Sequence, residues 1–420
     1  MNRGLDRSLL VVVILLSAFG MLIIYSAGQT DLNLTPHGSW LHQPRWLWVL
    51  QLIWTVIATG AAALAYRTSF RILEWATPWL YGIALVILSI TLVIGTGAGS
   101  AASSKSWLAI GSIRIGQPVE LAKLATILML ARWFAARREA PNTLRGLIPP
   151  MIITAVPALL VLKQPDLGSA IVFVGIFFAM LYWAGVAPSL LLLLSSPAIS
   201  LLLAWNTALW SGWMIILFGL LLVWRPFVLE GIAVYLANSA MGVLAFVVWN
   251  RLDVYQQDRI RSFLNPEAYR HDAAFQAIQS KVAIGSGGWI GAGLTLGTQK
   301  RSGFISEPST DFVFAVVGEE LGLLGVLLAL ALFVALLIIL VRIARRASDP
   351  FASLVVFGIV GVIFTHIFEN VGMTVSIMPI TGIPLPFFSY GGSFLLALFL
   401  ALGLAFRAAK EARAAGYVES

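Results

Sequence analysis

Residues 312–342 read FVFAVVGEELGLLGVLLALALFVALLIILVR, and the only charges are Glu319, Glu320 and the final arginine. A helix of about 20 apolar residues crosses the roughly 30 Å hydrocarbon core of a bilayer, so this stretch predicts a membrane-spanning helix. Similar runs recur along the chain and predict an all-α polytopic membrane protein. The predicted spans are 8–26, 47–65, 77–96, 119–136, 147–163, 168–186, 188–204, 209–224, 228–249, 312–342, 352–377 and 391–407.

Composition leads to the same class. Apolar residues make up 59% of the 420 residues, charged residues 11%, and the mean hydropathy is +0.91. A soluble protein carries about a quarter charged residues, so this chain cannot cover a soluble globule and is expected to form one membrane domain over 1–420. It has no cysteine, which excludes disulfide and thiolate chemistry. We find no zinc, nucleotide or nucleic-acid motif.

The N-terminus allows two interpretations. Arg3 and Arg7 precede an apolar run that ends in small residues at 26–28, as in a signal peptide. The run from Ser8 to Tyr25 is long for a signal peptide and adequate for a span, so we interpret it as a retained first helix.

Basic residues predict the orientation. With the N-terminus in the cytoplasm, most arginines and lysines fall in cytoplasmic segments, as the positive-inside rule requires. Both termini are then cytoplasmic, with a tail over 408–420. Residues 250–311 form a long extracytoplasmic loop, and loops of this length are usually functional or disordered.

Three charged residues are predicted at helix starts, and Glu319 is predicted two to three turns deeper in its helix. Glu120 and Lys123 share one helical face just inside the membrane, where charges suggest function or a mutual ion pair. Asp166 is either an N-cap or a cavity carboxylate. Glu319 either is satisfied by neighbouring helices or lines a cation pathway.

Asp311 also allows two interpretations. Thr310 and Asp311 are common helix-cap residues, yet a partly desolvated carboxylate at a cavity mouth is what a general base needs. Lys105 and Trp107, outside the membrane, are expected to contact a ligand.

The loop 250–311 carries further candidates. Arg259 and Arg261 lie two residues apart and suit phosphate. A glycine-rich run, 285–293, does not match the dinucleotide fingerprint and is expected to lie in the headgroup layer. Gln279, Ser280 and Lys281 precede that run, with glutamines at helical spacing.

The segment 378–393 contains too many prolines and glycines for a regular helix. Irregular backbone persists in a membrane only against protein or a water-filled cavity. We therefore expect an outer re-entrant loop, including Ser389, beside the long loop.

Several separated motifs together resemble the SEDS family of bacterial cell-wall proteins, and most of all its RodA branch. The resemblance covers nearly the whole chain. The motifs are Lys105–Lys123, QPDLG at 164–168, FLNP at 263–266, QAIQSKVAIGSGG at 276–288, GTQ at 297–299, TDFVFAVVGEELG at 310–322 and PLPFFSYGGS at 384–393.

The resemblance implies a helical bundle of ten spans, so that 205–249 is predicted to be an inserted transmembrane hairpin. It also implies a peptidoglycan glycosyltransferase that polymerises lipid II during cell elongation. Such an enzyme works with a class B penicillin-binding protein and other elongation-complex proteins. The family's essential aspartate maps onto Asp311 and its nearby glutamate onto Glu307. Ser306 and Ser309 depart from the usual proline and histidine.

The implied mechanism uses Asp311 as the base for the acceptor hydroxyl. Lys105, Lys123, Arg259 and Arg261 would hold the diphosphate, aided by a divalent cation, Mg²⁺ or Mn²⁺, if one is present. Glu307 would orient Asp311 or hold that cation. Two alternatives remain open from the sequence. One is a lipid II flippase with a polar path through Glu120, Lys123, Asp166 and Glu319, although no internal repeat is found. The other is a non-catalytic scaffold.

Overall fold

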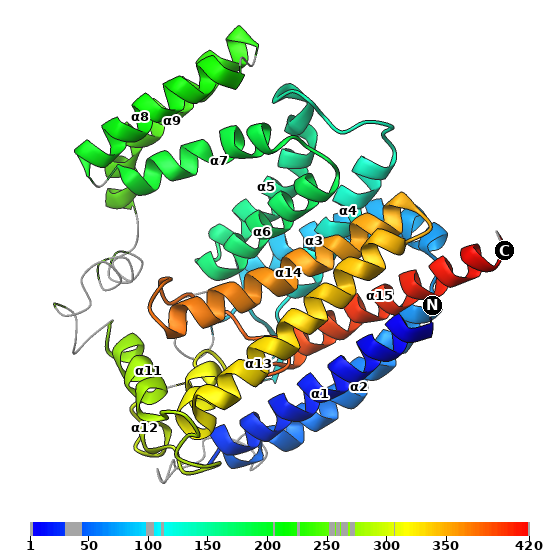
Figure 1. Ribbon diagram of the computed structural model, residues 1–420, viewed down its shortest axis with the longest axis vertical. Coiled ribbons are helices and arrows are strands. Elements are labelled where there is room, and N and C mark those ends of the chain that lie inside the picture. Colours follow the sequence, from blue (N-terminus) through cyan, green and yellow to red (C-terminus); the bar gives the residue numbers. More distant parts are fainter. Residues whose placement is uncertain are drawn as a thin grey trace.

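The computed structural model describes residues 3–29, 44–97, 105–110, 113–204, 206–224, 227–251, 257, 261, 268, 274–305 and 307–418. Within this part of the chain the fold is a bundle of long helices with one small hairpin (Figure 1). The helices are α1 (Arg3–Ala27), η2 (Pro44–Trp46), α2 (Leu47–Arg67), α3 (Phe70–Ile94), α4 (Val119–Ala135), η3 (Arg145–Leu147), α5 (Ile148–Leu162), α6 (Leu167–Trp183), α7 (Pro188–Leu203), α8 (Thr207–Trp224), α9 (Val228–Arg251), α11 (Phe275–Ser286), α12 (Thr298–Arg301), α13 (Val313–Arg346), α14 (Pro350–Thr374) and α15 (Gly392–Val418). The strands are β1 (Leu108–Ile110) and β2 (Ile113–Gly116).

Every predicted span corresponds to one helix, which confirms the all-α polytopic membrane fold. Among the described residues, nine helices are long and apolar enough to cross a membrane, while α6 and α7 are shorter apolar helices. α4 has 17 residues and carries the predicted pair of opposite charges in its first turns. The small antiparallel hairpin β1–β2, just before α4, was not expected from the sequence.

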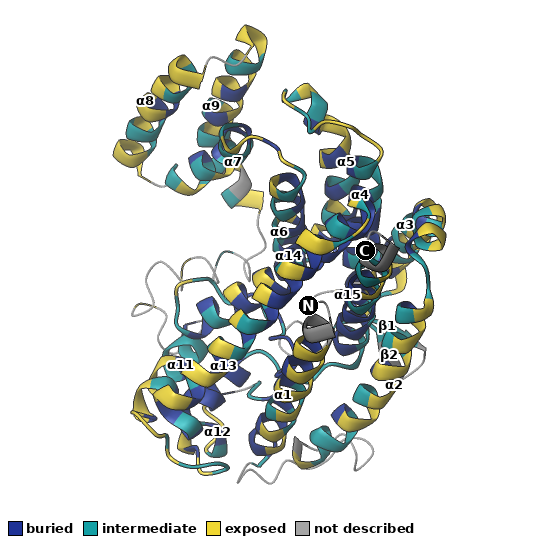
Figure 2. Cartoon of the chain, turned by 45° about the vertical axis from the view of Figure 1, so that its right-hand side comes forward, coloured by how far each residue is buried: buried dark blue, intermediate teal, exposed yellow. Residues whose placement is uncertain are grey.

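Burial orders the helices around α14. In the span window of α14, 67% of residues are buried inside the protein, against 11% in α2, so α14 is central and α2 peripheral. α14 packs against α13, α6, α4 and α15. Figure 2 shows the same order, with exposed positions along the outer helices. Both chain ends lie at one end of the bundle, and the start of α13, preceded by Asp311, lies at the other (Figure 1).

The predicted hairpin 205–249 corresponds in position to α8 and α9, which stand apart from the bundle beside α7 (Figures 1 and 2). A small apolar cluster of Leu193, Met214, Leu217 and Val234 joins the three helices. Asn238, fully buried, donates to Ser196 Oγ (2.7 Å) and accepts from Trp213 Nε1 (3.1 Å). The hairpin therefore has a core of its own, and its status as an insertion stays a prediction.

Helix α13 is broken at Gly322, where the backbone is non-helical (φ 61°, ψ −160°). In a continuous helix, the N–H groups of Leu323 and Leu324 would donate to carbonyls four residues earlier. Here Leu323 N–H donates to the Gly288 carbonyl (2.9 Å). Leu324 N–H donates to the Trp289 carbonyl (3.1 Å). The loop between α11 and α12 thus takes the place of the missing helical turn.

The carbonyls released by the break are satisfied by the same loop. Ala292 N–H donates to the Glu319 carbonyl (2.9 Å), and Gly293 N–H donates to the Glu320 carbonyl (3.0 Å). Two helical bonds are thereby exchanged for four bonds between the loop 287–293 and α13. A buried helix break needs such replacement, because unpaired backbone groups are costly away from water.

Glycines permit this close backbone contact. A Cβ on Gly287 would lie 1.9 Å from the Gly318 carbonyl oxygen. Gly291 has φ +81°, and a Cβ there would lie 2.0 Å from the Glu320 carbonyl oxygen. The sequence predicted that the glycine-rich run lies in the headgroup layer. In the structure its backbone packs directly against α13.

Replacing Gly291 with alanine is expected to destabilise the protein. The new Cβ would combine an unfavourable positive φ with a backbone clash, costing at least about 1–3 kcal/mol. Thermal unfolding of the purified protein in detergent measures the loss. Gly285→Ala is the matched control, because a Cβ at Gly285 meets nothing within 4 Å. Equal melting temperatures for the two variants would contradict this account of the contact.

Candidate active site

Residues 307–312 form a tight turn that leads into α13. The Glu307 carbonyl accepts N–H groups from Thr310 (3.4 Å) and Phe312 (3.2 Å). Phe312, not Asp311, is the N-cap residue of α13, and it makes no side-chain cap hydrogen bond. The structure therefore does not assign Asp311 as the N-cap, and Asp311 is partly exposed.

The re-entrant loop 375–391 holds this turn from the other side. Tyr390 N–H donates to the Ser309 carbonyl (2.8 Å), and the Ser389 hydroxyl donates to the Thr310 carbonyl. Ser389 also accepts the N–H of Leu385 (2.8 Å). The predicted proximity of the C-terminal loop to the Asp311 segment is confirmed, and Ser389 contributes through the backbone of the turn.

Asp311 itself is fixed by α14 and by a glycine. Asn370 Nδ2 donates to the Asp311 carbonyl (2.9 Å) and to the Ile383 carbonyl (2.7 Å). Gly382 has φ +72°, and a Cβ there would lie 3.2 Å from Asp311 Oδ2. The backbone of Asp311 is thus positioned by α14, and the lack of a side chain at Gly382 leaves room beside its carboxylate.

Glu307 lies in the same turn and is half-buried. Burial raises the pKa of its carboxyl group above the ordinary value of 4.5, and the hydrogen bond from Thr310 Oγ1 (3.4 Å) opposes that shift. A carboxyl group with a raised pKa beside Asp311 can hold a proton closer to neutral pH than an exposed glutamate.

The other predicted carboxylates are used structurally. Asp166 caps α6 by accepting the Ser169 N–H (2.9 Å), and its second oxygen accepts from Gln117 Nε2 (3.2 Å). The N-cap interpretation is confirmed. Glu120 pairs with Lys123 (2.9 Å), which confirms the ion-pair interpretation.

Lys123 is enclosed by this network. Its ammonium also lies 3.2 Å from His366 Nε2, and only 2% of the residue is exposed. His366 Nδ1 lies 3.0 Å from the Pro384 carbonyl, which can only accept, so Nδ1 carries the proton and Nε2 accepts from Lys123. In this conformation the Lys123 ammonium is engaged by Glu120 and His366.

A cavity lies between α4, α14 and α15, and Glu120, Lys123 and His366 are part of its lining. Apart from these three residues its lining is apolar, with Ile127, Ile363 and Phe394 among the side chains. Its chemistry suits hydrocarbon rather than sugar.

Lys105 and Trp107 belong to the segment that forms the small hairpin. Trp107 exchanges backbone hydrogen bonds with Thr96, and Lys105 N–H donates to the Gln164 carbonyl (3.3 Å). Lys105 is exposed and Trp107 partly buried. The hairpin is thereby joined to the start of α6, next to Asp166.

The long loop is described in part. Arg259 and the FLNP motif lie outside the described residues. Arg261 lies over the Trp249 ring, 5.0 Å from its centroid. α11 confirms the helical spacing expected near Gln279, which is partly exposed, and Lys281 is exposed. Ser280 is buried, and its hydroxyl donates to the Thr374 carbonyl (2.8 Å), so it joins α11 to the end of α14.

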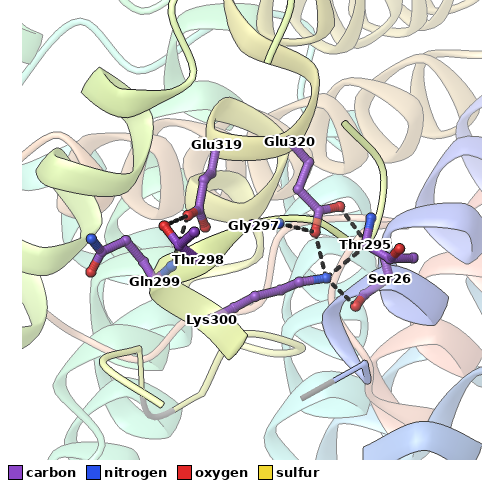
Figure 3. Close-up of polar contacts among 8 residues, drawn as sticks. All are labelled: Ser26, Thr295, Gly297, Thr298, Gln299, Lys300, Glu319 and Glu320. Carbon is purple, nitrogen blue, oxygen red and sulfur yellow. Dashed lines mark hydrogen bonds and ion pairs between the residues drawn. The ribbon is translucent and has the colours of Figure 1, made fainter. Parts of the chain in front are cut away.

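Glu319 and Glu320 meet residues of the long loop rather than a cation pathway (Figure 3). Glu319 Oε1 accepts from Gln299 N–H (2.8 Å) and Thr298 Oγ1 (3.2 Å), at the start of α12. Glu320 forms an ion pair with Lys300, and all three charged residues are at most 1% exposed. Glu319 was expected to be satisfied by neighbouring helices or to line a cation pathway, and the first interpretation is confirmed, with α12 as the helix.

Ser26 of α1 completes this cluster. Its hydroxyl donates to Glu320 and accepts from Lys300 Nζ (2.8 Å) and Thr295 N–H (2.9 Å) (Figure 3). Burial lowers the pKa of Lys300, an effect that the Glu320 carboxylate opposes. α1, α12 and α13 are thus joined by one ion pair and one hydroxyl.

Comparison with known proteins decides the family. The family model described as "Cell cycle protein", for FtsW, RodA and SpoVE, matches residues 6–221 and 211–414. The chain belongs to the FtsW/RodA/SpoVE family. It is 33% identical to the peptidoglycan glycosyltransferase MrdB of Escherichia coli, covering 95% of this chain and 92% of that protein. It is 30% identical to the peptidoglycan glycosyltransferase RodA of Treponema pallidum, covering 95% and 96%.

Solved structures have the same fold. The crystal structure of the rod shape determining protein RodA of Thermus thermophilus matches with a TM-score of 0.59 at 24% identity, covering 96% of each chain. A chain from work described as "Structural coordination of polymerization and crosslinking by a peptidoglycan synthase complex" matches with a TM-score of 0.67 at 25% identity, covering 95% of this chain and 97% of that one. The predicted family, enzyme class and multi-pass membrane character are confirmed.

The sequence analysis did not identify three residues that hold the buried charges of this FtsW/RodA/SpoVE family member. Lys300 and Ser26 satisfy Glu320, and His366 accepts from Lys123. The only available signal was charge: Lys300 is a cation close in sequence to two adjacent acids in an apolar stretch. Nothing in the sequence indicated Ser26.

Replacing Lys300 with methionine is expected to destabilise the protein strongly. The change leaves Glu320 buried without its cation, and breaking one side of a buried ion pair costs roughly 3–5 kcal/mol. Thermal unfolding in detergent measures this, with the exposed Lys281→Met as control. Adding Glu320→Gln to Lys300→Met should restore part of the lost stability. A Lys300→Met variant with the melting temperature of the wild type would contradict a stabilising role for the cluster.

Glu307→Gln is expected to alter the pH dependence of stability. The folded protein holds the Glu307 proton more tightly than the unfolded chain does, because its pKa is raised. The resulting contribution to stability is therefore complete below the ordinary pKa and is lost as pH rises through the raised value. As pH rises from the ordinary pKa of glutamate to the raised pKa of Glu307, the melting temperature of the wild type should fall relative to that of Glu307→Gln. A difference that is constant with pH would contradict the assignment.

Proposed function

We propose that this chain polymerises lipid II into β-1,4 glycan strands, with Asp311 as the general base. The observation that carries the proposal is the position of Asp311. Asp311 is partly exposed just before the first turn of α13, and its backbone carbonyl accepts from Asn370 Nδ2 (2.9 Å). Glu120, Lys123 and Asp166, by contrast, are engaged in the ion pair and the helix cap described above.

The proposed step is a displacement at the anomeric carbon of the donor sugar. The acceptor 4-hydroxyl oxygen forms the new bond, and its proton passes to the Asp311 carboxylate. The bond from the anomeric carbon to the lipid diphosphate breaks, and the diphosphate leaves with the electron pair. Attack from the face opposite the leaving group turns an α-linked donor into a β-1,4 product.

Cations are needed where the diphosphate departs. Lys105 and Arg261 are the described candidates, and Arg259, which lies outside the described residues, remains a third. Lys123 would have to leave Glu120 to take part, so we assign it to the ion pair.

Glu307 would orient Asp311 or hold a cation. Among the described residues there is no group of three or more histidine, aspartate or glutamate side chains arranged to hold a metal. The described residues by themselves do not form a site for a protein-held Mg²⁺ or Mn²⁺, and no step is assigned to one.

The orientation and the partner belong to the same proposal. Both termini would face the cytoplasm of a bacterial inner membrane and the Asp311 end would face outward, which agrees with the two chain ends lying together away from Asp311 (Figure 1). The partner would be a class B penicillin-binding protein, with other elongation-complex proteins. The similarity to a chain from a peptidoglycan synthase complex supports that choice.

The flippase alternative required a polar path through Glu120, Lys123, Asp166 and Glu319. Each of these side chains has a structural partner, so no observation favours the path over the enzyme. The scaffold alternative is separated from the enzyme by the assay below.

Asp311→Asn is expected to abolish glycan polymerisation. Loss of a general base reduces the rate by about 10²–10⁴-fold, and the amide keeps the volume of the side chain. The assay uses purified protein with its penicillin-binding partner and lipid II, and detects polymer on gels. Asp349→Asn, at the N-cap of α14, is the matched control because that residue lies outside the proposed site. Normal polymer from Asp311→Asn would exclude it as the base.

A further inference from the structure

The loop between α11 and α12 presents two large apolar side chains that the described part of the chain leaves uncovered. Trp289 is 74% exposed and Ile290 is 77% exposed. Both lie at the tip of the loop 287–293, the same loop whose backbone replaces the missing turn of α13. Neither side chain contributes to the Asp311 turn or to the Lys300 cluster.

The tip is joined to the surface of α13 that faces away from the bundle. The Trp289 carbonyl accepts from Leu324 N–H (3.1 Å), and the Leu324 side chain is 58% exposed. Leu327 and Leu328 follow at helical spacing and are also exposed. Trp289 and Ile290 therefore extend an apolar surface that continues along a membrane-spanning helix.

The length of α13 places this junction at the edge of the hydrocarbon. From Leu323 to Val341 the chain has no charged residue, and Arg342 follows. These residues form about 29 Å of helix at about 1.5 Å per residue, close to the roughly 30 Å of a hydrocarbon core. Glu319 and Glu320 precede this stretch and so lie just beyond the boundary. The break at Gly322 marks the boundary itself.

The tip is built to be rigid rather than to fold on contact. Four backbone hydrogen bonds attach its loop to α13, and Lys300, shortly after it, is locked to Glu320. Residues 282–299 contain no charge. A fixed, uncharged tip with an indole ring at a bilayer boundary suits the headgroup layer, where tryptophan is enriched.

We propose that Trp289 and Ile290 insert into the lipid leaflet at the Asp311 end of the bundle and anchor the α11–α12 segment to the membrane surface. The occupant is lipid, because the tip continues the lipid-facing surface of α13 without a charged break. As a consequence, the segment that leads into the Glu307–Asp311 turn is held at the level of the lipid headgroups.

The absence of cysteine from the sequence permits a direct test. Ile290→Cys and, separately, Trp289→Cys are labelled with a nitroxide in the full-length protein, reconstituted in vesicles of phosphatidylethanolamine and phosphatidylglycerol. Collision with oxygen, which concentrates in lipid, and with a water-soluble nickel chelate gives the depth of each label. Leu324→Cys is the lipid reference, and Glu139→Cys, on an exposed polar turn, is the aqueous reference.

The expected oxygen-to-nickel collision ratio at position 290 is close to that at Leu324 and several-fold above that at Glu139. A ratio equal to that at Glu139 would place the tip in water and overturn the proposal. A label shielded from both reagents would indicate a covering protein, such as a second copy, and would overturn it as well. Label depth is read without turnover, so failure of the polymerisation assay leaves this result intact.

Discussion

The exchange of backbone hydrogen bonds at Gly322 is the constraint on which the rest of the Asp311 end depends. A membrane helix cannot leave N–H and C=O groups unpaired near hydrocarbon, so α13 can break only where another backbone replaces its turn. The loop 287–293 supplies that backbone, and glycines at the contact allow the approach. A long connecting loop is thereby fixed to a span as firmly as one helical turn is fixed to the next.

The buried charges follow from the same contact. Glu319 and Glu320 lie directly before the break, where their side chains meet α12 instead of lipid. Lys300 balances one of the two carboxylates, and Ser26 brings α1 into the cluster. Charges at the membrane boundary are tolerated here because each is paired or hydrogen-bonded inside protein, which is the condition that a buried charge has to meet.

The polar residues of the bundle divide into two groups. Asp166 caps a helix, and Glu120, Lys123 and His366 satisfy one another within the core. These contacts organise α4, α6 and α14 around the re-entrant loop. Asp311 differs because Asn370 of α14 holds its backbone while the residue remains partly exposed. Rigid backbone beneath a partly exposed acid is the arrangement that a positioned general base requires.

The sequence alone determined the class, the helices and the family, because apolar length and motif order are local properties. It also offered the cap at Asp166 and the pair of Glu120 with Lys123, each beside one alternative, since both contacts span three residues of one helix. The partners of Glu320, the hairpin at Lys105 and the break at Gly322 were decided only by the tertiary structure. Each depends on segments distant in sequence, Ser26 and Glu320 being the extreme case, and a local pattern carries no information about which distant backbone will satisfy it.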